Sequence, residues 1–108
     1  MARTANQTKQ PVNAQDFLDV DRVIHEPARL AIVAVLAACE SADFVYLRNA
    51  TTMTQGNLSA HLGKLEEAGY VEIEKRFQGK KPNTLCRLTD AGRTAFKQYR
   101  AQVAKLVG

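Results

Sequence analysis

The stretch that decides the fold is ATTMTQGNLSAHLGKLEEAGY, residues 50–70. Thr54 precedes leucines at positions 58, 62 and 65, whose spacing is that of one helical face, so its hydroxyl is placed to cap the first helical turn. Met53 and Leu58 are spaced for a hydrophobic staple across this cap. Gly69 supplies the residue type at which helices commonly end. The stretch therefore predicts one helix that begins after Thr54 and turns its leucines toward a core.

The other side of this helix is small and polar. Gly56 and Gly63 each cost a helix about 1 kcal/mol relative to alanine, and close approach to another surface would explain them. Small residues let a helix backbone enter the DNA major groove, where polar side chains contact base edges and phosphates. An ordinary amphipathic helix with a tolerant polar face is the alternative. The polar side chains available for such contacts are Gln55, Asn57, Ser59 and Lys64.

Length and composition fit one domain. The chain has 108 residues, of which 45% are hydrophobic, enough to bury a core of its own. No apolar run approaches the roughly 20 residues of a membrane span, and the first ten residues lack the apolar segment of a secretory signal, so we expect a cytoplasmic protein without membrane contact. Cys39 and Cys86 stand in apolar contexts and are expected to be buried thiols, with a disulfide or redox switch as the alternative. No compact Cys/His cluster occurs, so we expect neither a metal nor a cofactor.

The charge is unevenly distributed along the chain. The net charge is +4, yet residues 16–43 hold six acids and two arginines, whereas residues 75–87 hold five basic residues and no acid. A basic cluster confined to one segment is typical of a protein that binds a polyanion. A solvated basic hairpin without a partner is the alternative.

Helices are predicted on the amino-terminal side of the opening stretch. Residues 1–13 are polar and are expected to form a disordered arm, followed by one domain over residues 14–108. A first helix is expected from about Asn13 to Ile24, and Pro27 suits the start of a second, highly apolar helix. Ser41 or Asp43 would cap a short helix over residues 44–50 whose inward residues are Phe44, Val45 and Leu47. Two short helices joined by a tight turn form a helix-turn-helix.

After Gly69 the apolar period changes from 3.6 to 2. Val71, Ile73 and Phe77 alternate with Glu72, Glu74 and Arg76, which predicts a strand with one solvated face. The run RFQGKKPN is expected to form a hairpin turn, and Thr84 to Leu88 the returning strand.

The carboxyl-terminal segment is predicted to be a long helix capped by Thr89. Its apolar positions continue to the end of the chain, so this helix is expected to need a partner surface. Self-association would supply it, with the first helix and this helix meeting the same helices of a second copy. Folding back on its own domain is the alternative. The expected dimer-interface residues are Phe17, Leu18, Phe96, Tyr99, Val103 and Leu106.

Three motifs carry a resemblance to a known family: IHEPARLAIVAVL (24–36), LSAHLGKLEEAGYVEIEK (58–75) and KPNTLCRLTDAGRTAF (81–96). With them the sequence resembles the winged helix-turn-helix transcriptional regulators, close to small single-domain proteins related to the MarR and ArsR families. The resemblance implies a mainly α fold with a small β-hairpin, dimerised through its terminal helices. It also implies a homodimer on double-stranded DNA, with the two helices from Thr54 to Ala68 in successive major grooves and the wings at Phe77 to Pro82 along the flanking backbone or minor groove.

The resemblance also places the site. It leaves two roles for His61, packing against the core or contact with DNA. The cysteine pairs or histidine and carboxylate sets of the metal-sensing members are absent from this sequence, so metal sensing is not implied. Whether the protein binds a small-molecule effector is left open by the resemblance. The implied DNA contacts are Thr54, Gln55, Gly56, Asn57, Ser59, Ala60 and Lys64 on the helix, and Arg76, Lys80 and Lys81 on the hairpin.

The function expected from these features is sequence-specific regulation of transcription, by a repressor bound to an inverted repeat. A winged helix used as a protein-interaction module without specific DNA binding is the alternative. The sequence holds no Gly-rich phosphate loop and no nucleophile near a base, so we do not expect an enzyme.

Overall fold

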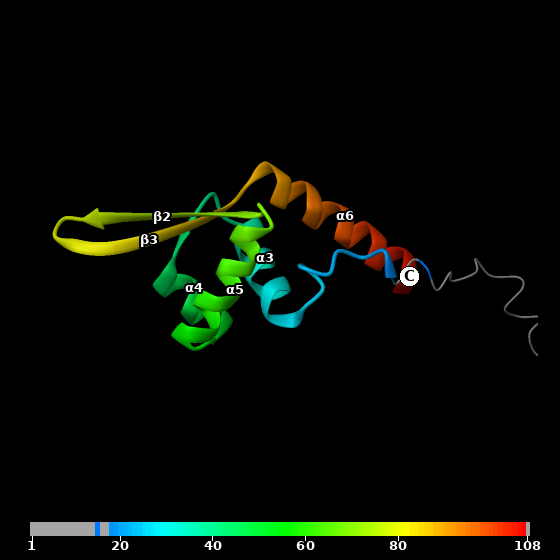
Figure 1. Cartoon of the computed structure of the whole chain (residues 1–108), viewed down its shortest axis with the longest axis horizontal. Helices are drawn as coiled ribbons and strands as arrows, with labels where there is room; N and C mark the ends of the chain where they lie inside the picture. The colour runs from blue at the N-terminus through cyan, green and yellow to red at the C-terminus, as the bar shows by residue number, and fades with distance from the viewer. Residues whose placement is uncertain (1–14, 16–17, 108) are drawn as a thin grey trace, which may run out of the picture.

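The fold is described by a computed structural model that covers residues 15 and 18–107 (Figure 1). The predicted arm over residues 1–13 and the expected interface residue Phe17 lie outside the described residues. Helices surround one end of a small antiparallel sheet, and the β2–β3 hairpin extends to the left beyond them (Figure 1). The elements in chain order are α3 (Pro27–Ala37), β1 (Ala42–Asp43), α4 (Phe44–Thr51), α5 (Gln55–Glu67), β2 (Val71–Gln78), β3 (Lys81–Leu88) and α6 (Asp90–Val107).

Local capping fixes α5 as predicted. The Thr54 hydroxyl accepts a hydrogen bond from the Asn57 backbone N–H at 3.2 Å, which satisfies a free donor of the first turn. At the other end Gly69 has φ +81, and the Gly69 and Tyr70 amides donate to the carbonyls of Glu66 and Leu65. This pairing is a Schellman motif, in which glycine takes the left-handed position.

The helix before α5 is capped by Asp43, whose carboxylate accepts from the Tyr46 backbone N–H at 2.7 Å. Leu47 is fully buried and Phe44 half-buried, as predicted. The prediction that Val45 points inward was wrong, because its side chain is 56% exposed. Val45 follows Phe44 by one residue, which is about 100° around the helix and away from the buried face.

The main core lies between α3, α5 and the base of the sheet. The three leucines of α5 are buried, and they pack with apolar residues of α3 and α4 and of all three strands. Cys86 belongs to this core, and burial raises the pKa of its thiol to about 11. Cys39 is half-buried, and neither cysteine forms a disulfide. The predicted burial of the thiol is therefore confirmed for Cys86, whereas Cys39, just after α3, is buried only in part.

The sheet has the strand order β1-β3-β2, with both neighbouring pairs antiparallel. Gln78 pairs with Lys81, so the turn is the two residues Gly79 and Lys80, with φ +67 at the glycine. The returning strand therefore begins at Lys81, three residues before the predicted start, because a two-residue turn suits the twist of the strands and lets pairing run to the tip. Phe77 continues the predicted alternation of β2, but it lies one pair before the end of the hairpin and is 71% exposed, so the apolar side of the strand is buried only toward its base.

The predicted first helix does not reach Ile24. Residues 19–26 form turns and bends, because the Asp21 carboxylate accepts hydrogen bonds from the backbone amides of Val23 and Ile24 and so replaces helical pairing. Glu26 before Pro27 is extended, with φ −148, as a residue before proline prefers. The apolar residues of the segment are buried all the same, since Val20 and Ile24 pack against Tyr99 of α6.

Helix α6 begins at the predicted cap, where the Gly92 amide donates to the Thr89 hydroxyl at 3.0 Å. Arg93 reaches back to the carbonyls of Ala37 and Cys39 at the end of α3. Tyr99 is only 5% exposed, because the turn segment of its own chain covers it. Part of the apolar face of α6 therefore folds back on its own domain.

Candidate nucleic-acid interface

One exposed surface of α5 carries every helix residue proposed to contact DNA. Thr54 as the cap and the six helix residues proposed with it are all exposed. Gly56 and Gly63 lie on the same side of the helix, and a methyl group added at either would meet no atom within 4 Å. Packing within the chain therefore gives no reason for these glycines.

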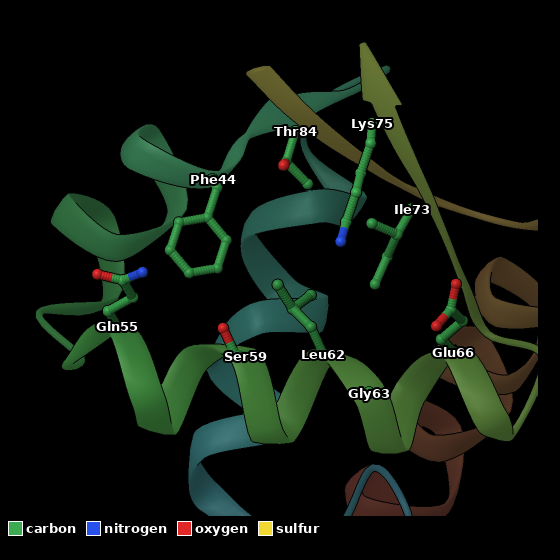
Figure 2. Close-up of a pocket in the computed structure, with 9 residues that line it drawn as sticks. All are labelled: Phe44, Gln55, Ser59, Leu62, Gly63, Glu66, Ile73, Lys75 and Thr84. Atoms are coloured by element: carbon green, nitrogen blue, oxygen red, sulfur yellow. The ribbon is translucent and has the colours of Figure 1, made fainter. Parts of the chain in front are cut away.

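A groove separates α5 from the hairpin. Its volume is about 660 Å³, and Figure 2 shows the side chains of Gln55 and Ser59 rising into it from α5. Lys75 points into the groove from β2 on the opposite side (Figure 2). The floor is apolar and the rim is polar; the lining residues are Phe44, Gln55, Ser59, Leu62, Gly63, Glu66, Ile73, Lys75 and Thr84.

Lys75 is a site residue that the sequence predictions did not include. It belongs to the basic run that was recognised, and in the structure it lies on the same face of β2 as Ile73, toward α5. The alternation of β2 carries this information, because residues two apart share a face. Thr84 pairs with Lys75 across the hairpin and lines the groove beside it.

The hairpin carries exposed cations beyond the groove. Arg76, Lys80 and Lys81 are all exposed. Arg87, the fifth basic residue of the run, is engaged instead within the sheet: its guanidinium lies 2.7 Å from the Glu72 carboxylate and 2.9 Å from that of Glu74. A hydrogen bond from Arg87 lowers the pKa of Glu74. The positive field of the hairpin therefore comes from its tip and from Lys75.

Comparison with known proteins identifies the domain. Residues 28–107 match the family described as the winged helix DNA-binding domain. The chain belongs to this family. An uncharacterised protein of Methanocaldococcus jannaschii is 36% identical over 85 residues, which make up 79% of this chain and 92% of that protein.

Solved structures share the winged helix fold. A transcriptional regulator homologue from Pyrococcus horikoshii OT3 aligns with a TM-score of 0.81 and 24% identity, over 86% of this chain and 94% of its own. The transcriptional repressor CouR, solved with a bound 23-mer DNA duplex, aligns with a TM-score of 0.66 and 20% identity, over 95% of this chain and 70% of its own. Regulators of the MarR family are among the structures with this fold. The predicted winged helix fold, mainly α with a small β-hairpin, and the predicted resemblance are thereby confirmed.

The winged helix framework assigns each element a place. Helices α4 and α5 form the helix-turn-helix, with Thr52 at φ +56 in the turn, and the β2–β3 hairpin is the wing. Two-residue strand β1 pairs Ala42 with Cys86 and joins the helix-turn-helix to the wing. This strand was not predicted, because two residues carry no alternation.

His61 lies on the side of α5 that faces the start of α3. Its Nδ1 is 3.2 Å from the Arg29 guanidinium and 3.9 Å from a Glu26 carboxylate oxygen. Glu26 also caps α3, where a hydrogen bond from the Arg29 amide lowers the pKa of its carboxyl group. Of the two roles left open for His61, the geometry favours packing against α3.

Two further features concern other kinds of site. In residues 15 and 18–107, His, Cys, Asp and Glu side chains form no group of three that could hold a metal ion. In the same part of the chain, no helix combines the length and the apolar character needed to cross a membrane.

Proposed function

We propose that this protein is a transcriptional regulator that binds double-stranded DNA with sequence specificity through α5. The observation that carries the proposal is the exposed small and polar surface of α5, which lies beside a groove with Lys75 on its far wall. Gly56 and Ala60 bring the helix backbone close to a facing surface, and Asn57 with Lys64 supplies hydrogen-bonding groups beside them. Such a surface fits the major groove, where base edges differ between all four base pairs.

The groove and the wing would bind the backbone of the DNA. With α5 in the major groove, the adjacent phosphate strand would run between α5 and β2, within reach of Lys75. The exposed cations Arg76, Lys80 and Lys81 would contact phosphates further along. These contacts position the protein, whereas the side chains of α5 discriminate between sequences.

We further propose a homodimer that binds an inverted repeat. Val107 is exposed at the end of α6, and Leu18 is exposed next to Asp19, whose carbonyl oxygen accepts a hydrogen bond from Gln102 of α6. Val103 and Leu106 are half-buried against the cluster around Tyr99. Apolar side chains at one end of a domain favour an interface between two copies. Phe96 and Tyr99 pack within the domain and would support this interface from beneath.

A regulator of this size would act as a repressor by occupying a promoter and excluding the polymerase. CouR, which has the same fold, is described as a transcriptional repressor and was solved with a bound DNA duplex. Since its identity to this chain is 20%, that likeness supports the fold, and the side chains of α5 and the wing support the activity.

Selection of bound duplexes from random DNA at near-physiological salt tests the proposal. We expect an inverted repeat whose half-sites lie about 10–11 base pairs apart, one turn of DNA. Enrichment of no sequence would refute specific DNA binding and favour the protein-interaction alternative.

The contribution of the wing is measured on the selected duplex. Replacing Lys80 and Lys81 by alanine removes two cations per protomer, so the slope of log Kd against log salt should fall by about 1.8 per protomer. Lys97→Ala with Lys105→Ala removes the same charge from α6 and is the matched control. Equal slopes for both double variants would show that the wing does not contact phosphates.

A further inference from the structure

Three cations lie along one stripe of α6, on the side that borders the end of α3. Arg93, Lys97 and Arg100 follow one another by four and three residues, the spacing at which side chains meet on a helix. All three are exposed. They surround a small pocket of about 240 Å³ whose other lining residues are Ala37 and Phe96. We call these five residues the α6 cationic pocket.

The three cations have no negative partner in the pocket. No acid lines it, and in the part of the chain that the structure describes no carboxylate forms an ion pair with any of the three. Like charges at this helical spacing repel one another and oppose helix formation. An anion bound between the cations would remove this repulsion, so the pocket is suited to an anionic ligand.

Two of the cationic side chains are already held in place. Arg93 donates to the carbonyl oxygens of Ala37 and Cys39 at 3.3 and 3.0 Å, and a guanidinium group has more donors than these bonds use. The Arg100 guanidinium lies over the Phe96 ring, 5.5 Å from its centroid, which is within the range of a cation–π contact. Side chains that are ordered before binding lose less conformational entropy when a ligand arrives.

The charge and the size of the pocket favour a phosphoryl group. Near neutral pH a phosphate monoester carries a charge of about −1.5 to −2, whereas a carboxylate carries a single charge, so a cluster of three cations suits the phosphate better. Guanidinium groups also bind phosphate oxygens through paired, parallel hydrogen bonds. A volume of about 240 Å³ holds such a group, and it is smaller than the roughly 300–1,000 Å³ of pockets that enclose a whole drug-sized molecule.

We propose that the α6 cationic pocket binds the phosphoryl group of a small phosphate ester. Its residues belong to α3 and α6 and not to α5 or the wing, and α6 runs away from the sheet on the side opposite to the wing (Figure 1). The proposal is therefore independent of the proposed function. Arg93 would join the bound phosphate to the carboxyl end of α3, and Lys97 and Arg100 would bind it from the middle of α6.

Isothermal titration calorimetry with pyrophosphate as the probe tests the pocket. The ionic strength is kept constant throughout, because exposed charges are screened by salt. We expect saturable binding of one pyrophosphate per chain. Acetate at the same ionic strength should bind at least about 10-fold more weakly, because it offers one charge and fewer charge-assisted hydrogen bonds.

Charge reversal separates the pocket from the total charge of α6. Lys97→Glu and Arg100→Glu should each raise the Kd for pyrophosphate about 10-fold or more, since a hydrogen bond to a charged group contributes about one factor of ten in affinity. Lys105→Glu changes the net charge equally at an exposed position of α6 outside the pocket. It is the matched control and should keep the wild-type Kd. Lys97→Glu should not lower the melting temperature measured without pyrophosphate, because it removes a repulsion and its side chain is exposed.

Four outcomes would overturn the proposal. The first is the absence of saturable pyrophosphate binding by the wild type. The second is an equal Kd in Lys97→Glu, Arg100→Glu and Lys105→Glu, which would show only non-specific attraction to a basic chain. The third is a lower salt slope of Lys97→Glu on the selected duplex without pyrophosphate binding by the wild type, which would assign the cations to the DNA backbone. The fourth is dissociation of a dimer by Lys97→Glu in sedimentation velocity, again without pyrophosphate binding, which would make the pocket a contact between two copies.

Discussion

Gly63→Ala should stabilise the fold and weaken DNA binding. Gly63 lies inside α5, and a methyl group at this position would meet no atom of the rest of the chain within 4 Å. Alanine is favoured over glycine in a helix interior by about 0.8–1 kcal/mol. For a domain of this size, a gain of about 1 kcal/mol raises the melting temperature by roughly 4–8 °C.

The same methyl group should oppose binding, because Gly63 lines the groove between α5 and the wing. An added methyl group in a closely packed contact costs about 1–3 kcal/mol, which corresponds to a Kd about 5- to 150-fold higher. Thermal denaturation and titration of the selected duplex measure the two effects on one protein sample. If the variant is more stable and binds DNA less tightly, glycine is needed at this position for DNA binding and not for folding.

Ala34→Gly is the matched control, since Ala34 is an exposed position of α3 outside the groove. It should lose about 1 kcal/mol of stability and keep the wild-type Kd. If Gly63→Ala raised the melting temperature and left Kd unchanged, close approach of DNA to this part of α5 would be refuted. A lower melting temperature would instead contradict the open space around Gly63.

Three further substitutions test individual contacts. Thr54→Ala should lower the free energy of unfolding by about 0.5–2 kcal/mol, measured by urea denaturation, while Thr54→Ser should retain it; equal losses would contradict capping by the hydroxyl. Gly92→Ala should destabilise by at least about 1–3 kcal/mol, because its Cβ would lie 2.2 Å from the Tyr70 carbonyl oxygen; unchanged melting would refute this close approach. A hydrogen bond to Asp21 and burial raise the pKa of Tyr70 from 10 to about 12, so its contribution to stability is complete below pH 10 and is lost as the pH rises through 12. Tyr70→Phe should remove this decrease in the free energy of unfolding at high pH. If the variant lost as much stability as the wild type, another group would be responsible for the decrease.

Local signals explain why α5 could be predicted from the sequence. Thr54 and Gly69 act on backbone groups within three or four residues of themselves, so their effect does not depend on the rest of the fold. The leucine spacing of α5 likewise fixes which side meets the core. The exposed candidate surface follows from the same period, and for this reason its residues were named correctly as exposed.

The segment before α3 could not be predicted in the same way. Val20, Val23 and Ile24 indicate burial, and they are buried or half-buried, but their mixed spacing does not decide between a helix and a turn. The Asp21 side chain decides it by taking two backbone amides, and Tyr70 holds that side chain from far along the chain. Such a contact is set by tertiary structure and leaves no trace in the local pattern.

The charge of the wing shows a second limit. A count over residues 75–87 gives five cations, yet Arg87 is paired with Glu72 and Glu74, which lie on the neighbouring strand and outside the counted run. Strand register therefore removes Arg87 from the interface and brings Lys75 into it. Pairing across the hairpin, rather than net charge, determines which cations are available to DNA.

Residues 19–26 connect α5 to α6. Asp21 accepts a hydrogen bond from Tyr70, just after α5, and Arg29 links the Val23 carbonyl at 2.6 Å to His61 on α5. On the other side, His25 lies 2.7 Å from the Tyr99 hydroxyl of α6.

These contacts bear on how a homodimer would recognise its operator. If two copies associate through α6, the contacts of residues 19–26 hold each α5 in a fixed position relative to that interface. The distance between the two α5 helices would then be set by packing, and the half-site spacing of the operator would have to match it. A change in the packing of Tyr99 would shift the position of α5 through the same segment. Such a change should therefore alter the affinity for the paired half-sites more than the affinity for a single half-site.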